Sequence, residues 1–157
     1  MKTVSLGLSP LASSRLAYGC WRVAGTWNPA EVTAESRAAG RRAILAAYEA
    51  GYTLFDNADI YCRGEAERIL GGVLKEVPGM RERVVILTKG GIRPAGDPEP
   101  DAPGRYDFSA AHLARACEES LRRLGIETID LYLLHRPDYL ADPHEIAGAF
   151  AQLQDAG

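Results

Sequence analysis

Apolar residues along this chain alternate between short strand-like runs and longer stripes at helical spacing. A short N-terminal stretch favours a hairpin, and Leu16–Trp21 is typical of a first strand that leads into a loop. Three further strand-like runs follow: Thr53–Phe55, Val84–Thr88 and Asp130–His135. The third strand, Val84–Thr88, is continuously apolar and β-branched, which predicts a strand buried on both faces.

Helical patterns separate these strands. The first predicted helix covers residues 34–50 and ends at Gly51. The second ends at Pro78 and has an apolar face of six residues: Ala66, Ile69, Leu70, Val73, Leu74 and Val77. Gly71 and Gly72 weaken this helical pattern, but glycines permit a helix to pack closely on a sheet.

Two more helices carry clear start signals. Ser109 is a good N-cap for a helix that ends before Gly125. Asp142 is an N-cap acid, followed by Pro143 and Glu145 in the first turn. The order is therefore β-α four times over, and crossovers of this length imply parallel strands.

One segment, residues 90–108, interrupts this rhythm after the third strand. It is rich in proline and glycine, and long loops without regular structure are uncommon and tend to be functional or mobile. We expect an irregular loop on the same rim as Lys89, either a substrate-side lid or a floppy insertion.

Composition narrows the class of protein. The 157 residues are 46% apolar and 25% charged, which predicts one globular domain and argues against disorder and membrane spanning. The net charge of -3 comes from interspersed acids and bases, so neither nucleic acid nor a membrane surface is an expected partner. The odd set Cys20, Cys62 and Cys117 lacks a CxxC pair, and the N-terminus lacks a secretory signal, so we expect reduced thiols and a cytoplasmic location.

Polar side chains stand at the ends of three successive strands. Asp56 and Tyr61 follow the second strand, Lys89 follows the third, and His135 ends the fourth. Parallel α/β folds keep their chemistry at the carboxyl ends of strands, so we expect these four side chains to meet. A lysine kept charged by Asp56 would favour an ionised phenol and make Tyr61 a better proton donor. A neutral His135 would then hydrogen-bond a substrate oxygen.

The segments that carry these residues resemble the aldo-keto reductase family. They are Asp-Asn-Ala-Asp-Ile-Tyr with the following Gly-Glu-Ala-Glu-Arg-Ile-Leu-Gly, Val-Val-Ile-Leu-Thr-Lys, Glu-Glu-Ser-Leu-Arg-Arg-Leu-Gly, and Asp-Leu-Tyr-Leu-Leu-His-Arg-Pro-Asp. The resemblance implies an α/β fold of the (β/α)₈ TIM-barrel type and an oxidoreductase that reduces aldehyde or ketone carbonyls to alcohols with NADPH (NADP). It also implies a catalytic tetrad: Asp56, Tyr61, Lys89 and His135.

The same resemblance implies which residues touch the ligands, with no metal ion among them. The cofactor contacts would come from Gly19, Cys20, Trp21 and Asp56. The contacts to a small-molecule carbonyl substrate would come from Trp21, Tyr61 and His135. Cys20 and Cys62 lie beside this site, where a thiol is either reactive or simply a small packing residue.

Length sets the extent of the expected domain. A (β/α)₈ barrel typically needs about 250 residues. We therefore expect residues 1–157 to form one domain, the truncated N-terminal half of such a barrel with about four βα units. Its first and fourth strands would be open edges, so we expect self-association, most simply as a two-fold pair, and little activity without the rest of the barrel.

Each candidate residue also has a plainer interpretation. Tyr61 alone is compatible with a wall aromatic, Lys89 with a solvated strand end, and His135 with a satisfied rim histidine. The remaining histidines, His112 and His144, fall in helical segments and are predicted to lie at the surface.

Three other functions stay open on the sequence. One is a non-catalytic half-barrel that acts as a binding or interaction module. The second uses Lys89 as a Schiff-base nucleophile with Tyr61 as a proton shuttle. The third is a metal cluster of Asp56, Asp59 and His135, although these residues match no recognisable metal motif.

Overall fold

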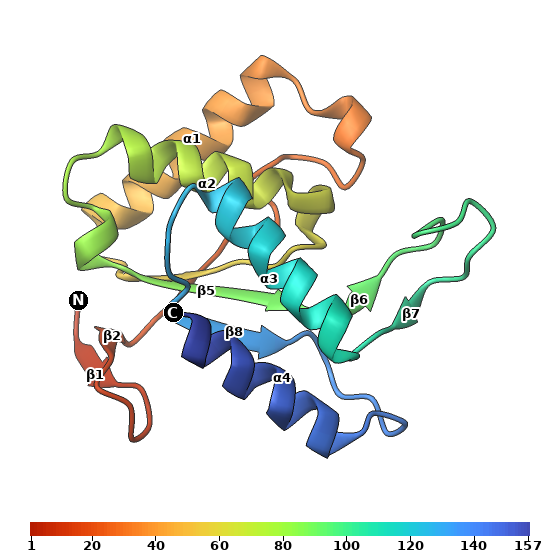
Figure 1. Ribbon diagram of the computed structural model, residues 1–157. Coiled ribbons are helices and arrows are strands. Elements are labelled where there is room, and N and C mark those ends of the chain that lie inside the picture. Colours follow the sequence, from red (N-terminus) through yellow and green to blue (C-terminus); the bar gives the residue numbers. More distant parts are fainter.

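An N-terminal hairpin opens the computed structural model, which describes residues 1–157. Strands β1 (Thr3–Ser5) and β2 (Ala12–Ser14) pair antiparallel, as the sequence predicted. Ser14 fastens the hairpin to the residue before the second core strand. Its N–H donates to Thr53 Oγ1 at 2.7 Å, and the Thr53 N–H donates to Ser14 Oγ at 2.9 Å. The hairpin therefore lies at the amino-terminal edge of the main sheet (Figure 1).

The main sheet has four parallel strands in the order β3-β4-β5-β8. Their bounds are Tyr18–Gly19, Leu54–Asp56, Val85–Gly90 and Leu131–Leu134. Each predicted strand is confirmed to within a few residues. The register sets Asp56 opposite both Gly19 and Leu87, and Lys89 opposite Leu133, so the polar strand ends come level.

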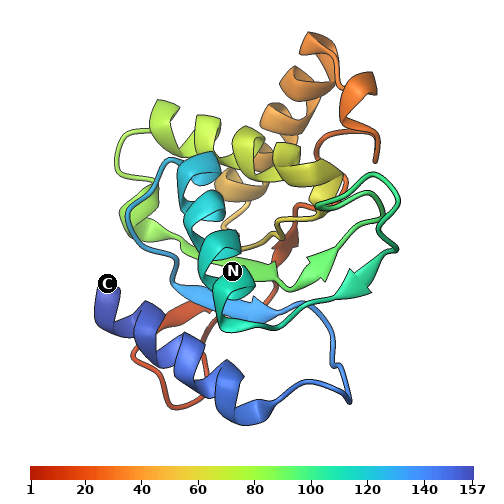
Figure 2. The same ribbon diagram turned by 45° about the vertical axis from the view of Figure 1, so that its right-hand side comes forward.

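Four helices connect and follow these strands, as predicted. They are α1 (Ala34–Glu49), α2 (Glu65–Glu76), α3 (Ala110–Leu124) and α4 (Pro143–Ala156). Each helix packs against the next along the chain, and Figures 1 and 2 show this succession beside the sheet. Short 3₁₀ turns add η1 (Pro29–Glu31), η2 (Tyr61–Gly64) and η3 (Arg81–Arg83). None of the helices is both long and apolar enough to span a membrane.

Local signals fix the helix ends. Thr33 and Ser36 form a reciprocal capping box at the start of α1. Ser109 caps α3 and Asp142 caps α4, each through a side-chain oxygen that accepts a backbone N–H. At the other end of α3, Gly125 has φ of +66°, a left-handed conformation that glycine adopts without steric cost.

The segment of residues 90–108 corrects the expectation of an irregular loop. It contains a second antiparallel hairpin, β6 (Ile92–Arg93) and β7 (Arg105–Tyr106), that extends from the carboxyl end of β5 (Figure 2). Arg93 Nε lies 2.7 Å from Asp107 Oδ2 and ties the base of the hairpin. Strands of two residues are too short to show an alternating pattern, which is why the sequence did not reveal them.

The main core lies between α1, α2 and strands β3, β4 and β5. Its fully buried members include Ile44, Phe55, Leu70 and Ile86. In β5 every residue except Lys89 is buried, which confirms the two-sided burial expected of this strand. The edge strand β8 is different, because Leu133 is 42% exposed. The open edges at β3 and β8 agree with the expectation.

The glycine pair in α2 serves a contact other than the predicted one. A Cβ on Gly71 would lie 2.4 Å from the backbone oxygen of Leu124, so this glycine lets α2 approach the end of α3 and not the sheet. Gly72 faces open space, with nothing within 4 Å of a Cβ.

Candidate active site

The four polar residues predicted to act together do meet at the carboxyl edge of the sheet. Lys89 is their centre, and its Nζ atom donates three hydrogen bonds. The acceptors are Asp56 Oδ1 at 2.5 Å, the backbone oxygen of Asn57 at 2.6 Å and Tyr61 Oη at 3.2 Å. The side chain of Lys89 is only 14% exposed, so this ammonium depends on protein groups for much of its solvation.

The backbone around these residues extends the parallel ladder beyond the strands. The Asn57 N–H donates to the Leu87 oxygen at 2.8 Å, and the Asp59 N–H donates to the Lys89 oxygen at 3.1 Å. The chain after β4 therefore follows β5 before it turns into η2 at Tyr61. On the other side of β5, the His135 N–H donates to the Gly90 oxygen at 2.8 Å. These backbone hydrogen bonds hold the segments that carry Asp56, Tyr61 and His135 close together.

His135 faces the edge of Tyr61. Their ring centroids are 5.7 Å apart, with an interplanar angle of 82°. Nδ1 of His135 is buried and has no hydrogen-bond partner among the protein groups. Burial, aided by the positive charges of Lys89 and Arg136, lowers the pKa of His135 to about 4. The imidazole is therefore neutral at neutral pH.

An aromatic wall adjoins the phenol. Trp27 lies edge-on to Tyr61 with centroids 6.3 Å apart, and Trp21 lies edge-on to Trp27 at 5.4 Å. Both indoles are about half exposed, at 52% and 46% for Trp21 and Trp27. The sequence analysis selected Trp21 and missed Trp27. A second tryptophan in the loop after the first strand was the signal that pointed to it.

The turn that carries Trp27 is held by one carboxylate. Glu31 accepts hydrogen bonds from Thr26 Oγ1 at 2.7 Å and from Asn28 Nδ2 at 3.1 Å. Because these two residues flank Trp27, the Glu31 carboxylate fixes the loop on both sides of the indole. The hydrogen bonds from Thr26 and Asn28 also lower the pKa of Glu31.

Cys20 packs in the core at the end of the first strand of the main sheet. Its side chain is fully buried in the core, and its N–H donates to the Asp56 oxygen at 2.8 Å. Burial raises the pKa of the Cys20 thiol, so it stays protonated. Through this hydrogen bond Cys20 joins β3 to the end of β4, and its cofactor contact stays a prediction. Cys62 is also buried, in agreement with a packing role.

A buried ion pair supports the site from the helix side. Glu67 of α2 is fully buried and accepts hydrogen bonds from Thr88 Oγ1 and Arg123 Nε, each at 2.6 Å. Thr88 precedes Lys89, so the pair ties β5 to α2 and α3. Removing one partner of such a pair leaves an uncompensated buried charge. The sequence analysis missed this network, whose signal was an acid on the buried face of one helix and an arginine on the next.

The other polar residues considered from the sequence fall outside this cluster. His112 was predicted to be a surface residue, but it is 8% exposed and lines a cavity together with Ile92 and Pro94. His144 is exposed, as predicted. No group of three or more histidine, cysteine or acidic residues is placed to hold a metal ion, so Asp56, Asp59 and His135 do not form a cluster of that kind.

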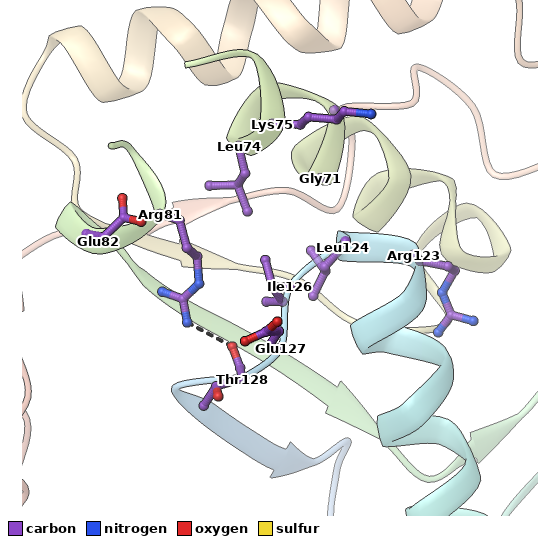
Figure 3. A pocket seen from close by; sticks show the side chains of 12 residues that line it. Gly71, Leu74, Lys75, Arg81, Glu82, Arg123, Leu124, Ile126, Glu127 and Thr128 are labelled. Carbon is purple, nitrogen blue, oxygen red and sulfur yellow. Dashed lines mark hydrogen bonds between the residues drawn. The ribbon is translucent and has the colours of Figure 1, made fainter. Parts of the chain in front are cut away.

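A hollow of the molecule lies at the opposite edge of the sheet from the candidate site. It has a volume of about 740 Å³ between α2 and the turn from α3 to β8. Figure 3 shows Arg81 pointing to Thr128, whose backbone oxygen accepts a hydrogen bond from Arg81 Nη2 at 2.8 Å. None of the four catalytic candidates lines this hollow, so it is separate from the candidate site.

Fold and site together define the class of protein. Four parallel βα units, with acid, phenol, amine and imidazole at their carboxyl edge, form about the first half of a (β/α)₈ barrel. The sequence model of the Aldo/keto reductase family matches residues 15–157, and the chain belongs to this family.

Relatives and solved structures agree. The chain is 41% identical over 149 residues to a 6-dehydroglucose reductase of Novosphingobium aromaticivorans, a match that covers 90% of this chain and 44% of the relative. It superimposes with a TM-score of 0.83 and 32% identity on the aldo-keto reductase AKR11C1 from Bacillus halodurans in its holo form, covering 100% of this chain and 47% of that one. The glycerol dehydrogenase AKR11B4 from Gluconobacter oxydans gives a TM-score of 0.84 at 32% identity, over 99% of this chain and 45% of that one. The chain thus spans about half the length of the relatives it matches.

Proposed function

We propose that this chain carries the catalytic half of an NADPH-dependent reductase that converts aldehyde or ketone carbonyls to alcohols. In this proposal residues 1–157 form the N-terminal half of the barrel domain, and full activity belongs to the complete barrel. One observation carries it: Lys89 Nζ is bonded to both Asp56 Oδ1 and Tyr61 Oη. A phenol held by an ammonium, which is held in turn by a carboxylate, is an arrangement suited to proton donation.

The proton is proposed to come from Tyr61. Reduction of a carbonyl builds negative charge on its oxygen, so a positioned proton donor lowers the barrier. The Lys89 ammonium at 3.2 Å stabilises the phenolate that Tyr61 leaves behind. Asp56 keeps the lysine charged in its partly buried position.

His135 and the indoles are proposed to orient the substrate. A neutral imidazole beside the phenol can bond the carbonyl oxygen without competing with Tyr61 for the proton. Trp21 and Trp27 give the substrate a half-exposed apolar wall next to Tyr61. These contacts would place the oxygen within reach of the phenol.

The donor set fits a nicotinamide cofactor. The cluster of an acid, a phenol, an amine and an imidazole can move a proton but contains no source of hydride. NADPH, when bound, supplies that hydride. Gly19 and Asp56 are opposite each other at the strand ends, and a Cβ on Gly19 would meet nothing within 4 Å. We propose that Gly19, Cys20, Trp21 and Asp56 form this chain's share of the cofactor site.

The other candidate functions have less support. A Schiff-base nucleophile must be a neutral amine, whereas Lys89 forms a close ion pair with Asp56.

The substrate class is proposed from the relatives. Because one of them is the 6-dehydroglucose reductase of Novosphingobium aromaticivorans, a sugar-derived aldehyde is the first compound to test. Three free cysteines support a cytoplasmic location.

The test measures cofactor binding and turnover together. NADPH fluorescence is titrated with the protein, and NADPH oxidation is followed with simple and sugar-derived aldehydes. We expect saturable cofactor binding, and aldehyde-dependent oxidation in the complete barrel that Tyr61→Phe greatly slows. Unchanged NADPH emission would instead support an interaction module. Substrate-dependent trapping by borohydride would support the Schiff-base mechanism.

A further inference from the structure

A second polar cavity lies beside the catalytic cluster without including it. Its volume is about 200 Å³, and it lies between η2, α3 and the β6–β7 hairpin. Four of the residues that line it carry the argument: Asp59, Arg63, His112 and Arg115. None of the four catalytic candidates contributes to its lining.

His112 lines this cavity and has a buried ring nitrogen without a partner. Its side chain is more than nine-tenths buried, and its Nε2 atom has no partner in the protein. Nδ1 lies 3.2 Å from Arg115 Nη2, and an arginine can only donate, so Nδ1 is the acceptor and the ring proton is on Nε2. Burial, together with the charges of Arg93 and Arg115, keeps the pKa of His112 below its ordinary value.

Two arginines at this cavity have no carboxylate partner. Arg63 donates only to the backbone oxygen of Ala95 at 3.3 Å, and Arg115 contacts His112. Neither guanidinium lies within 4.0 Å of an acid, in contrast to Arg123, which pairs with Glu67 and Glu119.

The acids of the cavity are neutralised by other residues. Glu119 lies 3.3 Å from Arg123, and Asp97 lies 3.8 Å from Arg93, so neither needs the two unpaired arginines. The charges of Arg63 and Arg115 are therefore available to a ligand.

Asp59 completes the lining and is itself unpartnered at Oδ1. Burial raises its pKa to about 7, and Glu67 of α2 and Glu119 of α3 act in the same direction. Arg123 and the backbone N–H of Ile60 oppose this rise, and Tyr132 of β8 is the other titratable group that interacts with Asp59. In its protonated form Asp59 adds a fourth donor to the cavity.

We propose that this cavity binds a small oxyanion, a phosphate-type or carboxylate group, through Arg63, Arg115 and the Nε2–H of His112. Guanidinium groups suit both anions because their planar donors match two oxygen atoms at once. This oxyanion site is distinct from the proposed reductase site. An anion bound here would affect the reductase site through Asp59, whose backbone N–H donates a hydrogen bond to the Lys89 oxygen.

Sulfate and acetate are suitable probes, because both stay fully ionised from pH 6 to 8. NMR titration at constant ionic strength follows the backbone amides of residues 59–63 and 112–116. We expect saturable shifts that Arg63→Gln and Arg115→Gln each weaken by about tenfold. Arg122→Gln is the matched control, since Arg122 lies on the same helix as Arg115 and outside the cavity.

The outcomes separate the alternatives. Tighter sulfate binding assigns a phosphate-type ligand, and tighter acetate binding assigns a carboxylate. The absence of saturable shifts with both anions, or an equal loss in Arg122→Gln, would overturn the site. Sulfate affinity should fall at least about threefold as the pH rises through 7, because ionised Asp59 repels the anion, and Asp59→Asn should remove this fall. An unchanged pH dependence in Asp59→Asn would contradict the place given to Asp59.

Discussion

Nζ of Lys89 lies 2.5 Å from Oδ1 of Asp56, although 33 residues separate them in the chain. The two residues come together because β4 and β5 are parallel neighbours whose carboxyl ends are level. Each side chain compensates the charge of the other where water has limited access, at 14% and 33% exposure for Lys89 and Asp56. The phenol of Tyr61 then completes a chain of three polar groups.

Replacing the proposed proton donor tests the assignment most directly. In the complete enzyme, Tyr61→Phe keeps the ring and its contacts with Trp27 and His135 but removes the hydroxyl. We expect kcat to fall by about 10²- to 10⁴-fold with little change in NADPH affinity. Steady-state kinetics and fluorescence titration measure the two quantities. Tyr106→Phe, at an exposed position on β7, is the control, and near-normal turnover in Tyr61→Phe would refute the role.

The lysine should act through the tyrosine. Lys89→Met removes the ammonium beside the phenol, and we expect kcat to fall by about 10²-fold or more. If both residues serve one proton transfer, the double variant with Tyr61→Phe should be little slower than either single variant. Single-turnover rates of the four proteins complete the cycle. Losses that multiply would show that Lys89 acts independently of Tyr61.

His135 should make stability depend on pH. Its pKa is about 4 in the folded protein and 6.5 ordinarily, so the unfolded chain binds more protons between these values. The stability that the folded protein gains from a neutral His135 is fully present above pH 6.5 and is lost as the pH falls toward 4. Urea unfolding across this range should show a smaller loss of stability in His135→Gln than in the unchanged protein. The same substitution at exposed His144 is the control, and identical pH dependence in His135→Gln would contradict the assigned environment.

Replacement of the two adjacent glycines in α2 by alanine should change the free energy of unfolding in opposite directions. Gly71→Ala places a Cβ 2.4 Å from the Leu124 oxygen, and we expect a loss of about 1–3 kcal/mol in the free energy of unfolding. Gly72→Ala meets open space and should gain about 0.5–1 kcal/mol, because alanine loses less backbone entropy in a helix. Chemical denaturation measures both. Equal effects would show that the α2–α3 contact is loose.

Much of the architecture follows from local patterns. The four βα units, the N-caps Ser109 and Asp142, and the stop at Gly125 are set by neighbouring residues, so periodicity and capping chemistry predicted them. The meeting of the four polar strand-end residues was also predicted, because parallel strands bring their carboxyl ends to one edge whatever their distance in sequence. The hairpin of β6 and β7 escaped prediction, since two-residue strands carry no period.

The sequence by itself determined the order of elements and the four residues at the strand ends. Only the tertiary structure decided which buried groups face one another. Cys20 lies in the core and Trp27 beside Tyr61, while Glu67 pairs with Arg123 across two helices. His112 is buried and shares a cavity with Ile92, which starts a hairpin 20 residues before it in the chain. Such contacts depend on how helices and loops pack over the sheet, and side-chain spacing within one element contains no information about its neighbours.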